Sequence, residues 1–271
     1  MRSDIAGNER TGMNNYIGKS SETEVTPDLS KYEKKHIQLK DIYGNTFTGL
    51  ASYGNYEFLM HEYGGDEDGI FIEDYLVYNS QIASIEEIEV HGTAELCTER
   101  LIMRRYTPED AEPLYQRLGT DPSMYQYSGW NPYATLEMAQ ETVQRFIDSY
   151  DDEHSYSWVM DDDDILVGTI GAYDYKIDPS TDHDQIEVGY SVVKNWQGRG
   201  YATDALKEVL KYLTENEGIS CVTAWCASEN TGSRRVLEKS GMQLVRTEQG
   251  GIVAGGKTYD KMIYEYKRNH G

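Results

Sequence analysis

Apolar and polar side chains alternate in short runs between residues 31 and 92, and turn residues separate the runs. The best-defined turn is Tyr43-Gly44-Asn45, with Leu39 before it and Phe47 after it. Several short strands at this spacing are typical of small antiparallel barrels. The pattern therefore predicts a small antiparallel β-barrel domain over residues 31–92.

Beyond about residue 98 the pattern changes, and amphipathic helices alternate with strands. Thr107 marks a helix start, because it can cap the helix while Pro108 occupies the first helical position and Asp110 follows three residues later. The predicted order of elements is β α α β β β α β α β β. This order indicates an α+β domain with a mostly antiparallel sheet over residues 98–271.

The first 30 residues are polar and show no apolar periodicity, which predicts a flexible N-terminal tail over residues 1–30. Met13 is an alternative start, so the sequence leaves open whether residues 1–12 are native. No apolar run reaches the roughly 18 to 20 residues of a membrane span, and the N-terminus has no secretory pattern. We therefore expect a cytoplasmic protein without a membrane partner.

The chain carries 47 acidic and 25 basic residues, a formal net charge of −22. Such a surface repels nucleic acid and anionic membranes, so neither is expected as a partner. It would attract a cationic small molecule or peptide. The alternative is that the charge only keeps the protein soluble.

Neither the cysteines nor the densest acidic run predicts a metal site. Cys97, Cys221 and Cys226 form no CxxC pair and are expected to be buried thiols. Asp161–Asp164 are four consecutive carboxylates, but adjacent residues of a two-stranded turn point apart. We expect them at a solvated hairpin tip, and no metal is predicted.

The stretch "NWQGRGYATDALKEVL", residues 195–210, places Gly198 and Gly200 between a predicted strand and a predicted helix. Unpaired N–H groups and the positive end of the helix dipole meet there, which suits a phosphate or pyrophosphate. The stretch has no GxGxxG motif, because Thr203 stands three residues after Gly200, and it has no GxxxxGK[ST] motif. A plain turn would account for only one of the two glycines.

Within this stretch, "QGRGYA" matches the Q/R-x-x-G-x-G/A signature of the GNAT superfamily of acyl-CoA-dependent N-acyltransferases. "ENTGSRRVLEKSGM" resembles the helix that follows it in that family. Together with "IEVGYSVVKNW", these segments resemble the RimJ/RimL-type branch, which acetylates protein N-terminal amines; relatives act on polyamines and antibiotics. The resemblance covers about residues 98–267 and implies the GNAT fold, a mixed, mostly antiparallel sheet flanked by helices. Residues 31–92 resemble Sm-like or SH3-like barrels in rhythm only.

The resemblance implies acetyl-CoA as acyl donor, with its pyrophosphate on the amides of the glycine stretch and its pantetheine arm along the preceding strand end. Asn230 would hydrogen-bond that arm, and Ser233 would lie near the sulfur. The cofactor-binding residues expected in this way are Ser191, Val192, Val193, Gln197, Gly198, Arg199, Gly200, Tyr201, Ala202, Asn230 and Ser233.

Amines are mostly protonated at neutral pH, so a carboxylate that accepts a proton would assist the attack. Glu187 is the candidate, because strand alternation sets it on one face with Gly189 and Ser191, and the resemblance implies that an acid is frequent at this strand position. Its alternative role is an ordinary solvent-facing acid. Ser233 stands where many family members have an acidic tyrosine, which leaves the general acid open, with Tyr190 and Tyr201 as nearby phenols.

The acceptor groove of the family draws on the loop between the first two helices, here "MYQYSGWNPYA". Tyr127, Trp130 and Tyr133 are therefore the predicted acceptor-binding residues, either as an aromatic wall for a cationic amine or as simple packing. Asp174, Asp178, Asp182 and Asp184 could attract a polycation, or could be solvated loop residues.

The sequence thus predicts a two-domain N-acetyltransferase that transfers acetyl from acetyl-CoA to a primary amine by direct attack. The acceptor is a protein N-terminus or a cationic small molecule, and a homodimer is allowed. The alternative is a non-catalytic acetyl-CoA sensor that acts through the N-terminal barrel.

Overall fold

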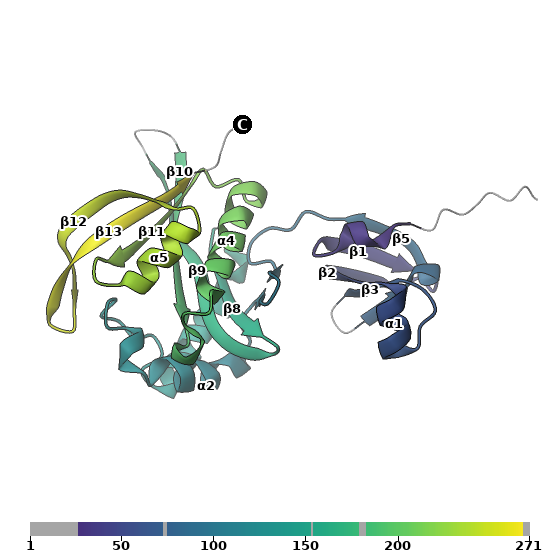
Figure 1. The fold of residues 1–271 in the computed structure, drawn as a ribbon, viewed down its shortest axis with the longest axis horizontal. Coiled ribbons are helices and arrows are strands. Elements are labelled where there is room, and N and C mark those ends of the chain that lie inside the picture. The colour runs from purple at the N-terminus through teal and green to yellow at the C-terminus, as the bar shows by residue number, and fades with distance from the viewer. Residues whose placement is uncertain (1–26, 73–74, 153, 179–182, 268–271) are drawn as a thin grey trace, which may run out of the picture.

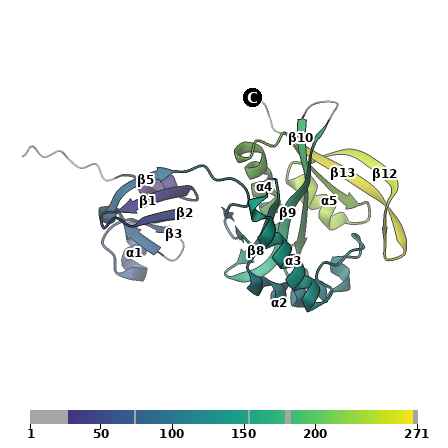
Figure 2. The ribbon, with the colours of Figure 1, turned by 180° about the vertical axis from the view of Figure 1, so that it is seen from behind.

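The computed structural model describes residues 27–72, 75–152, 154–178 and 183–267. Figures 1 and 2 show two separate sheets, joined by residues 88–95. The predicted tail lies almost wholly outside the described residues, and so does Asp182. Within the described residues, no helix combines the length and hydropathy needed to cross a membrane.

The N-terminal sheet contains the predicted antiparallel strands. The part of the chain that the structure describes has five of them here, in the order β4-β3-β2-β1-β5. Their bounds are β1 His36–Asp41, β2 Thr46–Gly54, β3 Gly69–Ile72, β4 Tyr75–Tyr78 and β5 Ile82–Glu87. The predicted turn joins β1 to β2, with Gly44 at φ 90°. Ile37, Leu39 and Ile70 are fully buried and form its core.

The expected closure of this sheet into a barrel is wrong. Among the described residues β4 and β5 are the two edges, and no ladder joins them. Closure requires tilted, staggered strands that are long enough to pair around the ring. β3 and β4 have only four residues each, and the 3₁₀ turn Asn79–Gln81 separates β4 from β5.

Residues 56–63, which we expected to continue the β pattern, form helix α1 (Tyr56–Tyr63) instead. The Asn55 side chain caps it by accepting the Phe58 N–H at 2.8 Å. Gly64 ends it in the left-handed conformation, at φ 69°. An Asn before and a Gly after a helix are its usual boundary residues, so the sequence did carry this signal.

The C-terminal sheet confirms the predicted mixed, mostly antiparallel arrangement. Among the described residues its eight strands follow the order β12-β13-β11-β10-β9-β8-β7-β6, and only β10 and β11 pair in parallel. The strands are β6 Leu96–Cys97, β7 Ile102–Arg104, β8 Tyr156–Asp162, β9 Ile165–Asp178, β10 His183–Val192, β11 Cys221–Ala227, β12 Gln243–Ala254 and β13 Lys257–Lys267.

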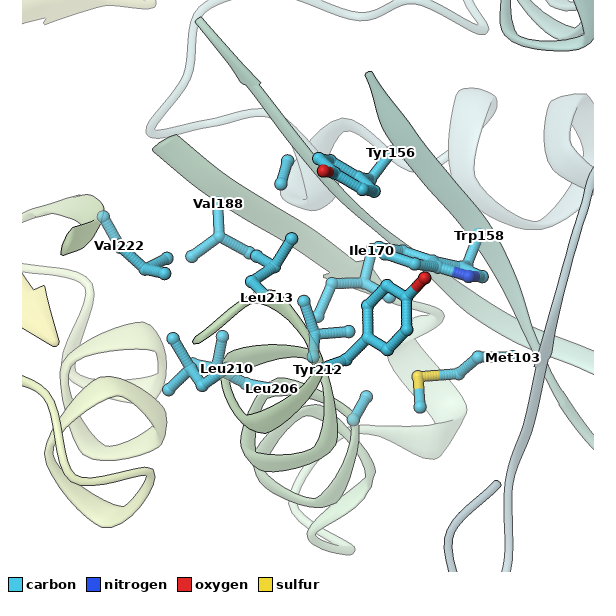
Figure 3. Close-up of a cluster of buried hydrophobic side chains, with 14 of the residues drawn as sticks. Met103, Tyr156, Trp158, Ile170, Val188, Leu206, Leu210, Tyr212, Leu213 and Val222 are labelled. Atoms are coloured by element: carbon cyan, nitrogen blue, oxygen red, sulfur yellow. The ribbon is translucent and has the colours of Figure 1, made fainter. Parts of the chain in front are cut away.

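Helices cover both faces of this sheet. Helices α4 (Tyr201–Lys211) and α5 (Thr231–Lys239) lie in front of it in Figure 1, and α3 (Leu136–Asp148) lies on the other side in Figure 2. The first core packs α4 and the turn that follows it against the sheet, where the Tyr212 ring lies edge to face with Trp158, 6.2 Å between centroids (Figure 3). The second core lies under α2 (Ala111–Leu114) and α3.

The predicted start of the first helix is confirmed. The Asp110 carboxylate accepts the Thr107 backbone N–H at 2.7 Å, and Pro108 occupies the first turn. A 3₁₀ turn comes first, and a π turn, Tyr115–Gly119, ends the segment. This turn brings the Gly119 backbone against the loop that carries Tyr133.

Asp161–Asp164 are not a wholly solvated tip. Asp163 and Asp164 make the turn, with φ 48° and 61°. Asp161 is buried instead and accepts from Arg104 Nε at 2.6 Å, and Asp162 accepts from the Tyr201 hydroxyl. The two strand ends therefore serve as acceptors for groups on β7 and α4.

A substitution at Gly119 tests how closely the π turn packs against the loop that carries Tyr133. A Cβ there would lie 1.8 Å from the Tyr133 carbonyl oxygen. We expect Gly119→Ala to lower the free energy of unfolding by about 1–3 kcal/mol, measured by chemical denaturation. Gly232→Ala is the control, because its nearest contact would be 3.6 Å away and alanine favours a helix. Equal stability of the Gly119 variant and the parent would contradict this account.

Candidate active site

A cavity of about 870 Å³ opens where the parallel strands β10 and β11 separate. Their ladder covers only Gln185–Glu187 and Cys221–Thr223. From Val188 to Val192, β10 pairs only with β9 among the described residues. The backbone edge on the β11 side is therefore available to a ligand, as the sequence predicted for a pantetheine arm.

The glycine stretch forms a cradle at one end of this cavity. Gly198 and Gly200 have φ of 77° and 96°, and Gly200 is the N-cap of α4. These left-handed angles explain why both positions are glycine. The first N–H groups of α4, at Tyr201 and Ala202, line the cavity and have no partner within the helix. The arrangement suits an anion.

Arg100 holds this cradle in place, and the sequence analysis missed it. Its Nη1 donates to the Arg199 carbonyl at 3.0 Å, and its guanidinium lies over the Tyr201 ring, 4.6 Å from the centroid. Its Nη2 pairs with Asp204 in the first turn of α4. This ion pair offsets a negative charge that would otherwise repel an anion in the cradle.

Three further cations reach the cavity. Lys194 comes from the turn before the cradle, and Arg235 and Lys239 lie one turn apart on α5. No carboxylate side chain is among the described cavity-lining residues. The lining is therefore basic although the protein as a whole is acidic. The sequence signal for it was the i, i+4 spacing of Arg235 and Lys239 on one helix.

The predicted cofactor residues divide into two groups. Val193 and Arg199 do not line the cavity: Val193 is buried, and Arg199 stacks on Trp196, 5.0 Å from the ring centroid. Gln197 donates to the Val192 carbonyl at 3.0 Å, which ties the cradle to the end of β10. The predicted residues brought together around the cavity are Ser191, Val192, Gln197, Gly198, Gly200, Tyr201, Ala202, Asn230 and Ser233.

The start of α5 carries Asn230 and Ser233 to the same cavity. The Asn230 side chain caps the helix by accepting the Ser233 N–H at 3.0 Å. The Ser233 hydroxyl lies 2.9 Å from the Tyr190 hydroxyl on β10. Burial raises the pKa of Tyr190 above its ordinary value, so the phenol keeps its proton at neutral pH. The strand thus supplies a phenol beside the serine.

Glu187 lies behind the cavity wall. Its Oε1 accepts from Trp225 Nε1 at 2.8 Å, and its carboxylate also bonds the Tyr173 hydroxyl. Trp225 and Tyr173 line the cavity, whereas Glu187 does not. Burial, followed by the charge of Glu187, raises the pKa of Tyr173 to about 12. Tyr173 therefore remains a neutral donor over the ordinary pH range.

The three predicted acceptor residues all line the cavity but differ in setting. Trp130 is 61% exposed, and Tyr133 is buried. The Tyr127 ring lies 5.4 Å from the Tyr259 ring, edge to face, and its hydroxyl donates to the Glu229 carbonyl at 3.3 Å. Tyr127 and Trp130 come from one loop, and Tyr259 of β13 supports the Tyr127 ring without itself lining the cavity.

The remaining candidates for chemistry lie elsewhere. Burial raises the pKa of Cys221 and Cys226 to about 11, and neither thiol lines the cavity. Among the described residues no three His, Cys, Asp or Glu side chains group to hold a metal. Asp184, from the predicted acidic cluster, accepts the Ser220 N–H at 2.9 Å.

Comparison with known proteins identifies this arrangement. Residues 100–243, more than half of the chain, match the family described as "Acetyltransferase (GNAT) domain". The chain belongs to the GNAT acetyltransferase family. This GNAT protein is an acyltransferase, as its relatives' names also indicate. The uncharacterized N-acetyltransferase YoaA of Bacillus subtilis is 27% identical, over 62% of this chain and 93% of its own.

Solved GNAT structures share the fold. A GNAT-family acetyltransferase from Bacillus anthracis gives a TM-score of 0.56 at 24% identity, over 64% of this chain and 98% of its own. RimL, a ribosomal L7/L12 alpha-N-protein acetyltransferase solved with coenzyme A, gives a TM-score of 0.56 at 17% identity, over 63% of this chain and 95% of its own. MccE, a microcin C7 self-immunity acetyltransferase solved with acetyl-CoA and AMP, gives a TM-score of 0.55 at 17% identity, over 63% of this chain and 93% of its own.

We expect Arg100→Ala to weaken acetyl-CoA binding about tenfold in calorimetric titration, because the cradle loses a charged donor to its backbone and Asp204 is left unpaired. Binding of acetyl-pantetheine, which lacks the phosphates, should not change. Arg246→Ala removes a comparable exposed pair, with Glu248 at 2.9 Å, and is the control. Equal weakening for both ligands would show that Arg100 supports the fold rather than the cradle.

Proposed function

We propose that this GNAT protein transfers an acetyl group from acetyl-CoA to a primary amine by direct attack. The observation that carries the proposal is the gap between β10 and β11, with the cradle at Gly200 at one end and Tyr173 and Glu187 at the other. The cradle amides, Arg235 and Lys239 would hold the phosphates. Acetyl-CoA supplies a thioester carbonyl that a neutral amine can attack.

Glu187 acts as the general base through Tyr173. The Tyr173 hydroxyl lies over Gly189, 2.7 Å from where a Cβ would be, so it stands between the cavity and the carboxylate. As the amine bonds to the carbonyl carbon, its proton passes to the Tyr173 oxygen and the Tyr173 proton passes to Glu187. Tyr173 is a neutral phenol at the end of this relay, and the Glu187 carboxylate is regenerated when the carboxyl releases its proton.

Tyr190 and Ser233 form the candidate acid pair at the sulfur end. Their hydroxyls lie 2.9 Å apart on the strand edge and the α5 start, which both line the cavity. The raised pKa keeps Tyr190 protonated, so it can give a proton to the leaving thiolate. A backbone N–H near Val192 or Val193 would bind the oxyanion, although Val193 N donates to the Val167 carbonyl here, which favours Val192.

The acceptor is a protein N-terminus or a cationic small molecule, with Tyr127, Trp130 and Tyr133 on its side of the cavity. RimL-type structural neighbours act on ribosomal protein N-termini by their printed names, which favours a peptide amine. No observation supports a non-catalytic sensor. Separate folding of residues 31–92 and 98–271, a homodimer and a cytoplasmic location also stay predictions.

A charge placed in the cradle tests donor binding. We expect Gly200→Glu to abolish acetyl-CoA binding in calorimetry, because the new carboxylate meets the phosphates and glutamate is strained at φ 96°. Gly44→Glu is the matched control, since Gly44 has φ 90° with open space around it, in the N-terminal sheet. Unchanged binding by the Gly200 variant would rule out the cradle as the phosphate site.

Replacing the base tests proton removal. We expect Glu187→Gln to lower kcat for amine acetylation about 100-fold, with little change in KM for acetyl-CoA, because glutamine keeps the shape but cannot take a proton. Raising the pH should restore part of the rate by deprotonating the amine in solution. Tyr173→Phe should lower kcat similarly.

Asp184→Asn is the control for the base. It neutralises another acid of β10 that bonds a backbone N–H outside the cavity, and we expect it to leave kcat within about twofold of the parent. If Glu187→Gln behaves like this control, the base lies elsewhere.

A further inference from the structure

Helix α1 of the N-terminal sheet turns most of its apolar side chains to solvent. Leu59 is its one buried residue. A Cβ on Gly54 of β2 would lie 3.0 Å from the Leu59 side chain, and one on Gly69 of β3 would lie 3.2 Å from it. A single leucine that fits over two glycines therefore anchors the helix, which lies beside β3 in Figures 1 and 2.

The exposed side chains of α1 form one patch. Tyr56, Met60 and Tyr63 follow the i, i+4, i+7 spacing of a helical stripe and are 44%, 51% and 59% exposed. Phe58 is 47% exposed, and the Phe58 and Tyr63 rings lie 6.4 Å and 5.6 Å from the ring of Phe71 on β3. We call these five residues the α1 patch. A contiguous exposed apolar surface of this kind marks an interaction site.

The charge around the α1 patch is one-sided. Residues 41–99 contain no Lys or Arg. Glu57 and Glu62 on the helix and Asp66 just after it are exposed, and His61 Nδ1 lies 2.6 Å from Glu62 Oε1. No lysine or arginine from this segment neutralises these acids. The patch thus combines aromatic rings with carboxylates that have no strong base from their own segment beside them.

Lysine and arginine side chains have the chemistry that fits this surface. Their methylene stems pack on apolar groups, and their charged ends stack on aromatic rings and bond carboxylates. Nucleic acid and anionic membranes carry the charge that these acids repel. Pairing of the patch with the same patch of a second copy would bring acids against acids, which is unfavourable. The surface therefore favours a basic polypeptide.

We propose that the α1 patch docks a basic segment of a partner protein, one in which Lys or Arg residues are interspersed with apolar residues. The rings and Met60 contact the apolar side chains and the stems of the basic ones, while Glu57 and Glu62 bond the charged ends. This inference goes beyond the proposed acetyl transfer and does not depend on it, because it concerns the other sheet.

Three short fluorescent peptides test the patch in anisotropy titrations with the full-length protein. The first alternates Arg and Leu with Gly, the second has Ser in place of Leu, and the third has Glu in place of Arg. We expect the Arg–Leu peptide to bind about tenfold more tightly than the Arg–Ser peptide, since apolar and aromatic contacts carry most interface energy. The Glu–Leu peptide should not bind.

Substitutions that keep the net charge separate the patch from general attraction to an acidic protein. Phe58→Ser and Met60→Ser should each weaken binding of the Arg–Leu peptide about fivefold and leave the Arg–Ser peptide within about twofold. Tyr43→Ser is the control, because Tyr43 is 73% exposed on the turn between β1 and β2, outside the patch. Thermal unfolding checks that the variants fold, and Met60, which is half exposed, is the variant least likely to disturb the sheet.

The carboxylates need their own comparison. Glu57→Gln should weaken the Arg–Leu peptide about twofold, as expected for an exposed ion pair, and added salt should remove the difference. Glu215→Gln, which neutralises an exposed acid of the C-terminal part, should not change the affinity.

Three results would overturn the proposal. The first is equal affinity for the Arg–Leu and Arg–Ser peptides, and the second is parental affinity in both the Phe58 and the Met60 variants. The third is a dimer of the parent in light scattering that Met60→Ser dissociates, because the patch would then belong to a second copy of this chain.

Discussion

The separation of two parallel strands is the constraint on which the site depends. β10 and β11 share a ladder over three residue pairs and then continue with other partners, β9 and β13. Backbone groups on the freed edge of β10 must find hydrogen bonds outside the protein. The same gap places the starts of α4 and α5 side by side, so two helix N-termini meet one cavity (Figure 1).

The charge of the cavity lining is opposite in sign to the net charge of the chain. The sequence has a formal net charge of −22, yet the charged side chains among the described cavity-lining residues are all basic. Arg100 neutralises Asp204, an acid that favours the start of α4 but would oppose an anion there. A cavity of opposite sign to the surface holds phosphates while the acidic exterior attracts amines.

A lysine of the N-terminal part contacts the segment that leads to the cradle. Lys34 Nζ donates to the Thr98 carbonyl at 3.1 Å, and the Thr98 hydroxyl accepts the N–H groups of Arg100 and Leu101. The segment that ends the connection from the N-terminal sheet thus also positions the guanidinium under Gly200. The cradle therefore depends on residues about 100 positions earlier in the chain.

The sequence by itself determined the order of the C-terminal elements from β7 onward, the capped start at Thr107 and the glycine cradle, because periodicity, caps and left-handed glycines are local properties. It did not predict the two-residue strand β6, which lies just before the expected boundary at residue 98. The sequence also contained the capping residues of α1, Asn55 and Gly64, but the alternating apolar pattern around them predicted strands instead. Tertiary structure alone decided that the N-terminal sheet stays open, since closure depends on pairing between distant edges. It likewise decided that Glu187 lies behind Tyr173, because the register between β9 and β10 brings these two residues together.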